Sequence, residues 1–221
     1  KVNVLLSAAR TESIEARVAA LESGDFHTKV IDVESYAISR SHNLCLSQLP
    51  DDAAEKMVAI VDIGATMTLF SVTKANKHLY SRDQIFGGEQ YTRSIASYYN
   101  KPFEEAESAK IKNELPPNYI FEVLAPFQTI LMQQIRRAIQ MFLTSSGADK
   151  VDYLIISGGS ALLEGVEKLL IDELGIQTVI ANPFNDMELA AIIDKEDIAK
   201  VAPQLMVATG LALRSFTPWH I

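Results

Sequence analysis

The chain carries two glycine turns, and each follows a run of apolar, β-branched residues. The first turn lies in VDIGAT at residues 61–66, and the second lies in ISGGS at residues 156–160. A backbone that meets a phosphate or an adenosine needs residues without a Cβ and free N–H groups. One such turn is common in proteins. Two of them, each behind an apolar strand, predict the two sides of a nucleotide-binding clamp.

The composition limits the class of protein. The 221 residues are 48% hydrophobic, which allows a buried core, and the net charge of −8 argues against nucleic acid or an anionic membrane as the main partner. No apolar run reaches the roughly 18 residues of a membrane span. The single cysteine, Cys45, excludes an internal disulfide and suits a reducing cytoplasm. We interpret it as a buried structural thiol.

The apolar pattern predicts an α/β fold. Strands at 2–9 and 26–33 alternate with helices at 11–24, capped by Thr11, and at 34–46. After a polar break at 50–52, three strands (57–62, 66–73 and 78–85) lead into a helix at 89–99. Further helices are expected at 103–112, from 120 to the SSG sequence at 145–147, at 161–174 and at 201–216. Strands are expected at 151–157 and 177–180, and a polar loop at 182–200.

The first turn offers a carboxylate next to free backbone donors. Asp62 could hold Mg²⁺ directly or through water, while the N–H groups of Gly64, Ala65 and Thr66 face a phosphate. The alternative is an ordinary Asp-Gly hairpin turn. At the second turn, Gly158 and the two residues after it could meet an anion at the start of a helix. The alternative there is a strand-to-helix turn with Ser160 as the N-cap.

Three weaker features could join these turns. Gly87 and Gly88 open a helix after the third strand, which by itself is a chain reversal. Glu107 and Lys110 lie three residues apart on one helix face, either as a solvated ion pair or as a contact to ribose and adenine. Asp32 and Glu34 flank a predicted strand end, where ligands of α/β folds bind, although Glu34 also fits the first turn of a helix.

The order of these features resembles the actin-like ATPase superfamily (ribonuclease H-like fold) of actin, Hsp70 chaperones, sugar kinases and FtsA. Residues 61–68 are similar to its second phosphate motif and residues 156–165 to its adenosine motif. Residues 31–37 and 207–212 are similar to its two connecting motifs. The chain also resembles the PilM family of type IV pilus assembly, from Lys1 nearly to Phe216. The segments that carry this resemblance are IDVESYA, VDIGA, FGGEQYT, SGGSA and GLALR.

This resemblance implies two lobes that close on ATP and Mg²⁺. Residues 1–50 would be the remainder of the first lobe, residues 51–99 and 148–221 subdomain 2A, and residues 100–147 an inserted subdomain 2B. Asp62 would organise Mg²⁺, and Glu34 would take the place of a residue that positions water. Nucleotide contacts would come from both turns, the helix start and the ion pair: Gly64, Ala65, Thr66, Gly87, Gly88, Glu107, Lys110, Gly158, Gly159 and Ser160.

The chain also departs from the superfamily pattern. The first phosphate motif is absent, so we expect a fragment that lacks the N-terminal part of the first lobe. Hydrolytic relatives have glycines at the positions of Ala65 and Thr66 and an aspartate at the position of Leu69. A tighter backbone and a lost carboxylate favour ATP binding over rapid turnover, and weak or no hydrolysis is expected.

The resemblance implies a cytoplasmic scaffold of the pilus inner-membrane platform, and through it pilus biogenesis and twitching motility. Its partner would be the N-terminal tail of PilN, bound in a groove that lies largely in the first lobe, so the membrane is reached only indirectly. Homo-oligomers are compatible with the superfamily. Two alternatives stay open, namely an FtsA-like division filament and an actin-fold ATPase or kinase with Asp32 or Glu34 as general base. A GspL-like secretion protein is a close cousin.

Overall fold

The computed structural model describes residues 6–216, which divide into two compact units at Val33 and Glu34. The first unit contains one helix, α1 (Thr11–Glu22), and none of its described residues is buried. Arg10 holds the N-cap position of α1 without a side-chain bond, so Thr11 begins the helix and does not cap it. The subdomain division proposed from the sequence stays a prediction.

The strand predicted at 26–33 is wrong, because these residues have no regular structure. A strand persists only when a neighbour pairs its backbone N–H and C=O groups. Residues 6–10, the described part of the strand predicted at 2–9, are also irregular, and the rest of that prediction lies outside the described residues. An apolar run alone therefore did not specify a strand in this unit.

The second unit is built on a five-stranded mixed sheet in the order β3-β2-β1-β4-β5. Its strands are β1 (Val58–Ile63), β2 (Thr68–Lys74), β3 (Lys77–Gln84), β4 (Tyr153–Ser157) and β5 (Gln177–Ile180). The first three form the expected antiparallel meander, whereas β4 runs parallel to β1 and to β5. The parallel register sets Asp62 beside Ser157, so the turns after β1 and β4 meet at one edge of the sheet.

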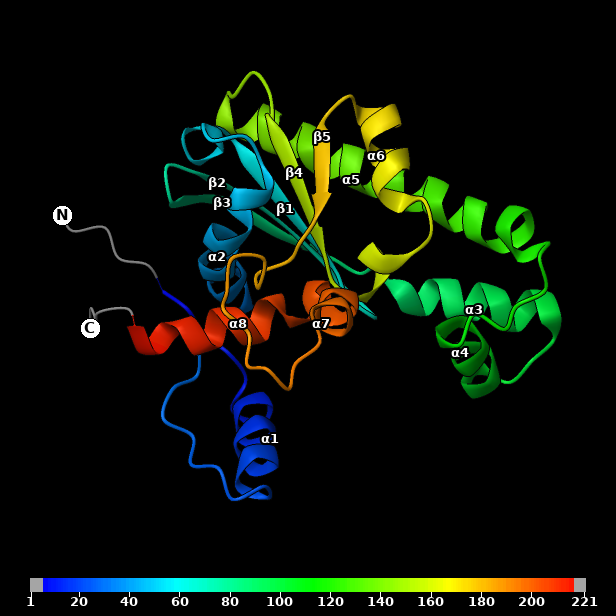
Figure 1. The fold of residues 1–221 in the computed structure, drawn as a ribbon, viewed down its shortest axis with the longest axis horizontal. Helices are drawn as coiled ribbons and strands as arrows, with labels where there is room; N and C mark the ends of the chain where they lie inside the picture. Colours follow the sequence, from blue (N-terminus) through cyan, green and yellow to red (C-terminus); the bar gives the residue numbers. More distant parts are fainter. Residues whose placement is uncertain (1–5, 217–221) are drawn as a thin grey trace. The chain divides into compact units, whose positions relative to one another are not determined.

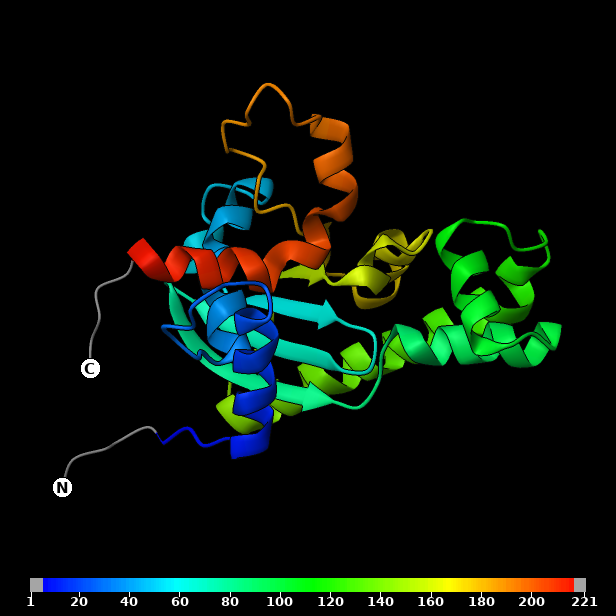
Figure 2. The same ribbon diagram turned by 90° about the horizontal axis from the view of Figure 1, so that it is seen from below.

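The two faces of the sheet carry different helices, as Figures 1 and 2 show. Ala59, Val61 and Ile63 of β1 share an apolar core with α5 (Ala125–Ser146) and α6 (Val166–Leu174). On the opposite face, Ile60 packs with residues of α2 (Glu34–Cys45) and α8 (Met206–Ala212). This alternation is the two-residue period of a strand that is buried on both sides.

A glycine allows α2 and α8 to cross closely. A Cβ on Gly210 would lie 1.8 Å from the carbonyl oxygen of Ala37, so no larger residue fits without separating the helices. The side chain of Arg40 spans the same crossing, where its Nε donates a hydrogen bond to the carbonyl oxygen of Gly210 at 2.9 Å.

The remaining helices of the second unit lie beyond the carboxyl ends of β1 and β4, or follow β5 in the chain. Helices α3 (Gly88–Tyr99) and α4 (Phe103–Ile111) pack together at that end, as both views show. A π-helical segment, Ile120–Leu124, precedes α5. The expected loop at 182–200 contains the start of α7 (Lys195–Val201), because the Asp194 carboxylate caps it by accepting from the N–H groups of Glu196 and Asp197.

Two predicted long helices are interrupted. The helix expected at 161–174 is a 3₁₀ turn (Gly159–Leu162) followed by α6, because Leu163 is extended and Gly165 is left-handed, with φ +72°. The helix expected at 201–216 is split into the end of α7, a 3₁₀ turn with Pro203 (Ala202–Leu205), α8 and a last 3₁₀ turn (Leu213–Phe216). Proline removes a backbone donor and so disfavours a continuous helix.

The cysteine prediction is confirmed. Cys45 is a free, fully buried thiol, and burial raises its pKa to about 12, so the thiolate is not available as a nucleophile. Among the described residues, no helix is long and apolar enough to cross a membrane.

Candidate functional site

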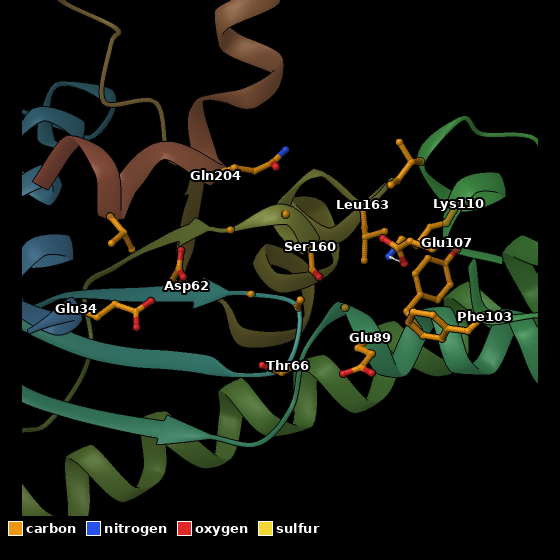
Figure 3. Close-up of a pocket in the computed structure, with 18 residues that line it drawn as sticks. Glu34, Asp62, Thr66, Glu89, Phe103, Glu107, Lys110, Ser160, Leu163 and Gln204 are labelled. Carbon is orange, nitrogen blue, oxygen red and sulfur yellow. Dashed lines mark hydrogen bonds and ion pairs between the residues drawn. The ribbon is translucent and has the colours of Figure 1, made fainter. Parts of the chain in front are cut away.

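A cavity of about 810 Å³ lies at the sheet edge where β1 and β4 end. Its walls come from the two glycine turns, the starts of α2 and α3, one side of α4 and the segment before α8 (Figure 3). Every residue predicted for the site lines it except Gly87, namely Glu34, Asp62, Gly64, Ala65, Thr66, Gly88, Glu107, Lys110, Gly158, Gly159 and Ser160. The fold therefore brings together groups that span more than half of the sequence.

Asp62 sits at one end of the cavity, near the carboxyl edge of β1 (Figure 3). Its carboxylate accepts a hydrogen bond from the Ser157 hydroxyl at 2.7 Å. Burial raises the pKa of Asp62, the Ser157 bond lowers it, and the nearby charge of Glu34 raises it, with a net upward shift. A carboxylate held in this way gains from a cation, because a cation restores the solvation lost on burial.

Glu34 lines the cavity as the first residue of α2, so the alternative that places it in the first turn of a helix is confirmed. Asp32 belongs to the first unit, and its carboxylate accepts a hydrogen bond from the N–H of Val33 at 2.8 Å. The proposed pair of strand-end acids is therefore wrong in its structural basis, because residues 26–33 form no strand. Glu34 alone of the two lines the cavity.

The first turn ties the hairpin to α3. The N–H of Gly64 donates to the carbonyl oxygen of Met67 at 2.9 Å, so this donor is used inside the turn. The carbonyl oxygens of Gly64 and Ala65 accept from the N–H groups of Gly88 and Glu89 at 2.9 and 2.8 Å. Within residues 6–216, the N–H groups of Ala65 and Thr66 donate no backbone hydrogen bond, and both residues are exposed in the cavity wall.

Gly87 serves packing. A Cβ at this position would lie 2.5 Å from the carbonyl oxygen of Ala65, so the absence of a side chain lets α3 begin against the turn. A Cβ on Gly88 would lie 2.8 Å from the Ser160 hydroxyl, so the start of α3 lies close to the second turn.

The second turn has a packed glycine and an open one. Gly158 has φ +81°, and a Cβ there would lie 2.4 Å from the carbonyl oxygen of Ile63, so the turn lies directly on β1. Gly159 has open space around it and lines the cavity. No long helix starts at this turn, so the expected helix N-terminus facing an anion is wrong. The open backbone of Gly159 remains.

The opposite end of the cavity contains a compact polar network between α3 and α4 (Figure 3). The Lys110 ammonium donates to the Glu107 carboxylate at 2.6 Å and to the Thr92 hydroxyl at 2.7 Å, and the Thr92 hydroxyl also contacts Glu107. Burial opposes ionisation of Glu107, but hydrogen bonds from Lys110 and Thr92 outweigh it, so its pKa is lowered. Glu107 and Lys110 are therefore a partly buried ion pair that the hydroxyl of Thr92 also contacts.

The chain is similar to several known proteins. A family model described as "Type IV pilus assembly protein PilM" matches residues 1–216. The chain belongs to the PilM family. A solved structure titled "PilM-PilN type IV pilus biogenesis complex" matches 95% of the chain and 60% of that chain, with 25% identity and a TM-score of 0.79. The actin-like fold predicted from the motifs is confirmed.

Two further proteins are similar to this PilM-family chain, one in sequence and one in fold. The ethanolamine utilization protein EutJ of Salmonella typhimurium is 30% identical over 138 residues, which are 62% of the chain and 46% of EutJ. The structure of MreB5 of Spiroplasma citri bound to ADP matches 94% of the chain and 66% of that chain, with 15% identity and a TM-score of 0.58. The chain thus spans about half the length of the curated relatives it matches.

Several wall residues of this PilM-family chain were not predicted as site residues, including Glu89, Tyr91, Phe103, Ile111, Leu163, Gln204 and Val207. Ser157 and Thr92 were also missed, although each contacts a predicted residue. Thr92 follows Gly88 by one helical turn, so its i+4 spacing could have placed it on the cavity side of α3. Gln204 had no comparable signal, because the split after α7 that positions it was not predicted.

Proposed function

We propose that this chain is the nucleotide-binding part of an actin-like pilus assembly protein, and that it binds ATP with Mg²⁺ in the cavity. The carrying observation is that both glycine turns, the start of α3 and the Glu107–Lys110 pair surround one space. Its volume of about 810 Å³ lies within the range of small-molecule sites.

The wall residues fit the parts of a nucleotide. The N–H groups of Ala65 and Thr66 would donate to phosphate oxygens, as expected for backbone donors in a turn. The open backbone at Gly159 would accommodate the adenosine, and Glu107 with Lys110 would contact the ribose and adenine. The nucleotide supplies the phosphoryl chemistry, and the chain supplies position and charge.

A magnesium ion would lie near Asp62. No group of three or more potential metal-ligating His, Cys, Asp or Glu side chains is found within residues 6–216, so Mg²⁺ would depend on the nucleotide and water for most of its ligands. Mg²⁺ commonly binds through one or two carboxylates together with substrate phosphates. The buried, Ser157-bonded carboxylate of Asp62 fits that use.

We further propose that hydrolysis is weak or absent. Leu69 stands where hydrolytic relatives have an aspartate, and it is buried against Ile38 and Ile60. Glu34 lines the cavity and could position water. Loss of the carboxylate at position 69 favours ATP binding over rapid turnover.

For the whole protein we propose a cytoplasmic scaffold that binds the N-terminal tail of PilN and thereby reaches the inner-membrane platform. Support comes from the PilM family assignment and from a similar structure described as a PilM–PilN complex. The negative net charge of −8 suits attachment through a protein partner better than direct binding to anionic lipid.

Titrating the complete protein with ATP, with and without Mg²⁺ and a PilN N-terminal peptide, tests the proposal by calorimetry. We expect saturable ATP binding that Mg²⁺ strengthens, and little phosphate release over hours. No saturable binding under any of these conditions would refute the nucleotide proposal. Rapid phosphate release that is lost in Glu34→Ala would instead favour an ATPase. Absence of binding to the PilN peptide would remove the proposed partner.

A further inference from the structure

The hydroxyl of Thr92 lies at the centre of the network between α3 and α4. Thr92 is fully buried and forms part of the second turn of α3, four residues after Gly88. Its Oγ1 accepts from the Lys110 ammonium at 2.7 Å and contacts the carboxylate of Glu107. A 3.2 Å contact to the carbonyl oxygen of Gly88 completes its surroundings.

A hydroxyl has one hydrogen to donate and two lone pairs to accept with. The charged carboxylate of Glu107 is a stronger acceptor than the carbonyl oxygen of Gly88, so the hydrogen serves the carboxylate. The lone pairs face the Lys110 ammonium. Thr92 therefore contacts both members of the ion pair at once, and a methyl group in its place could do neither.

The network occupies only part of the polar capacity of the pair. The contacts among Glu107, Thr92 and Lys110 use Oε2 of the carboxylate and Oγ1 of the hydroxyl. Within residues 6–216, Oε1 of Glu107 accepts no hydrogen bond from another residue. Both Glu107 and Lys110 line the cavity, and their side chains keep 37% and 18% of their exposed area.

We infer that Thr92 is a positioning residue that fixes the Glu107 carboxylate so that its second oxygen faces the ribose hydroxyls of a bound nucleotide. The inference rests on the nucleotide-binding function proposed above. Thr92 itself does not line the cavity and acts only through Glu107 and Lys110. A carboxylate that is already oriented loses less conformational entropy on binding than a freely rotating one. The hydroxyl of Thr92 can therefore raise the affinity for a nucleotide without contacting it.

The test compares Thr92→Val with Thr92→Ser in the complete protein, using ATP and 2′-deoxy-ATP as probes. Valine keeps the shape and removes the hydroxyl, whereas serine keeps the hydroxyl. We expect Thr92→Val to lower ATP affinity by about tenfold, the size of one charge-assisted hydrogen bond, and to lose preference for ATP over 2′-deoxy-ATP. Thr92→Ser should retain both the affinity and the preference.

Thr178→Val is the matched control, because Thr178 is buried to 2% exposure on β5 and its hydroxyl donates to the carbonyl oxygen of Ile176, away from the cavity wall. It should leave both nucleotide affinities unchanged. If Thr92→Val fails to fold, Thr92→Ala against Thr92→Ser carries the same comparison. A second readout needs no ligand: NMR titration of the Glu107 carboxyl should give a higher pKa in Thr92→Val than in the natural protein.

The outcomes separate the two proposals. Saturable ATP binding that is identical in Thr92→Val and the natural protein, with the same preference over 2′-deoxy-ATP, overturns the positioning role alone. An unchanged Glu107 pKa in Thr92→Val also overturns it. If the natural protein binds no ATP, the nucleotide proposal fails, and the positioning of a ribose contact fails with it.

Discussion

The two faces of the sheet are built from different chemistry. The face under α5 is a core of large side chains, in which the rings of Phe86 and Phe127 stack at 5.3 Å and those of Tyr80 and Phe142 lie 5.6 Å apart. The face under α2 and α8 combines small residues at a close helix crossing with buried polar groups such as His42 and Thr73. Asp62 and Ser157 alternate with core residues and so belong to this second face.

This difference indicates a division of labour. Apolar burial on the α5 face supplies stability without directional requirements. The α2/α8 face contains polar groups that need correctly placed hydrogen-bond partners or opposite charges. This face ends at the cavity. Two buried polar atoms there, His42 Nδ1 and Ser71 Oγ, have no hydrogen-bond partner among the described residues. Such groups reduce stability and are tolerated where another role compensates.

The largest effect should come from truncating the α5 face. Phe142→Ala removes a ring with 1% exposure and should lower the free energy of unfolding by about 4 kcal/mol, by lost burial and a cavity. Urea unfolding measures it. Because Phe142 is remote from the cavity wall, ATP affinity of the folded variant should stay unchanged. A large loss of ATP affinity in fully folded Phe142→Ala would contradict the proposed division of roles between the two faces.

On the α2/α8 face, adding one carbon should cost nearly as much. Gly210→Ala places a Cβ against the Ala37 carbonyl oxygen and must separate the helices, at about 3 kcal/mol of unfolding free energy. Gly24→Ala is the control, since its Cβ would meet nothing nearer than 3.4 Å and its φ is not left-handed. Equal stability of the two variants would show that α2 and α8 accommodate the added carbon without separating.

The pH dependence of stability should also originate on the α2/α8 face. Burial lowers the pKa of His42 to about 4 from the usual 6.5, although the neighbouring side chain of Asn43 partly opposes it. The unfolded chain then binds more protons below pH 6.5, so stability falls as the pH drops towards 4. We expect a loss of roughly 2 kcal/mol between pH 7 and pH 5 from this group.

Urea unfolding at several pH values measures that loss, with His42→Gln as the comparison because an amide does not titrate. The variant should have a flatter profile between pH 6.5 and 4. His78, whose pKa burial also lowers and whose ring contacts Tyr36 on α2, contributes in the same direction and is present in both proteins. Parallel profiles for the two proteins would assign the pH response elsewhere.

The sequence predicts the sheet well because β1 and β4 are apolar runs rich in β-branched residues, and a glycine turn follows each of them. It predicts β5 at 177–180 for the same reason, since Gly175 ends the helix before it. It fails where structure depends on partners far away. Residues 26–33 have strand-like composition but no pairing neighbour, and Thr92 acquires its role only when α4 folds back onto α3.

The smallest effect on stability, and the sharpest test of the α2/α8 face, is expected at Asp62. Burial raises its pKa despite the Ser157 bond, so the folded protein without ligand loses some stability as the pH rises through that pKa. Asp62→Asn removes the charge and should slightly raise the unfolding free energy at neutral pH, with Asp51→Asn, at an exposed position, as an unchanged control. The same variant should lose the gain in ATP affinity that Mg²⁺ provides, measured by calorimetry with and without the ion. A binding face differs from a core face because its side chains can lower the stability of the ligand-free protein and yet raise its affinity for ATP with Mg²⁺. If Asp62→Asn is less stable and keeps the Mg²⁺ response, Asp62 is a structural turn residue and the two faces differ only in packing.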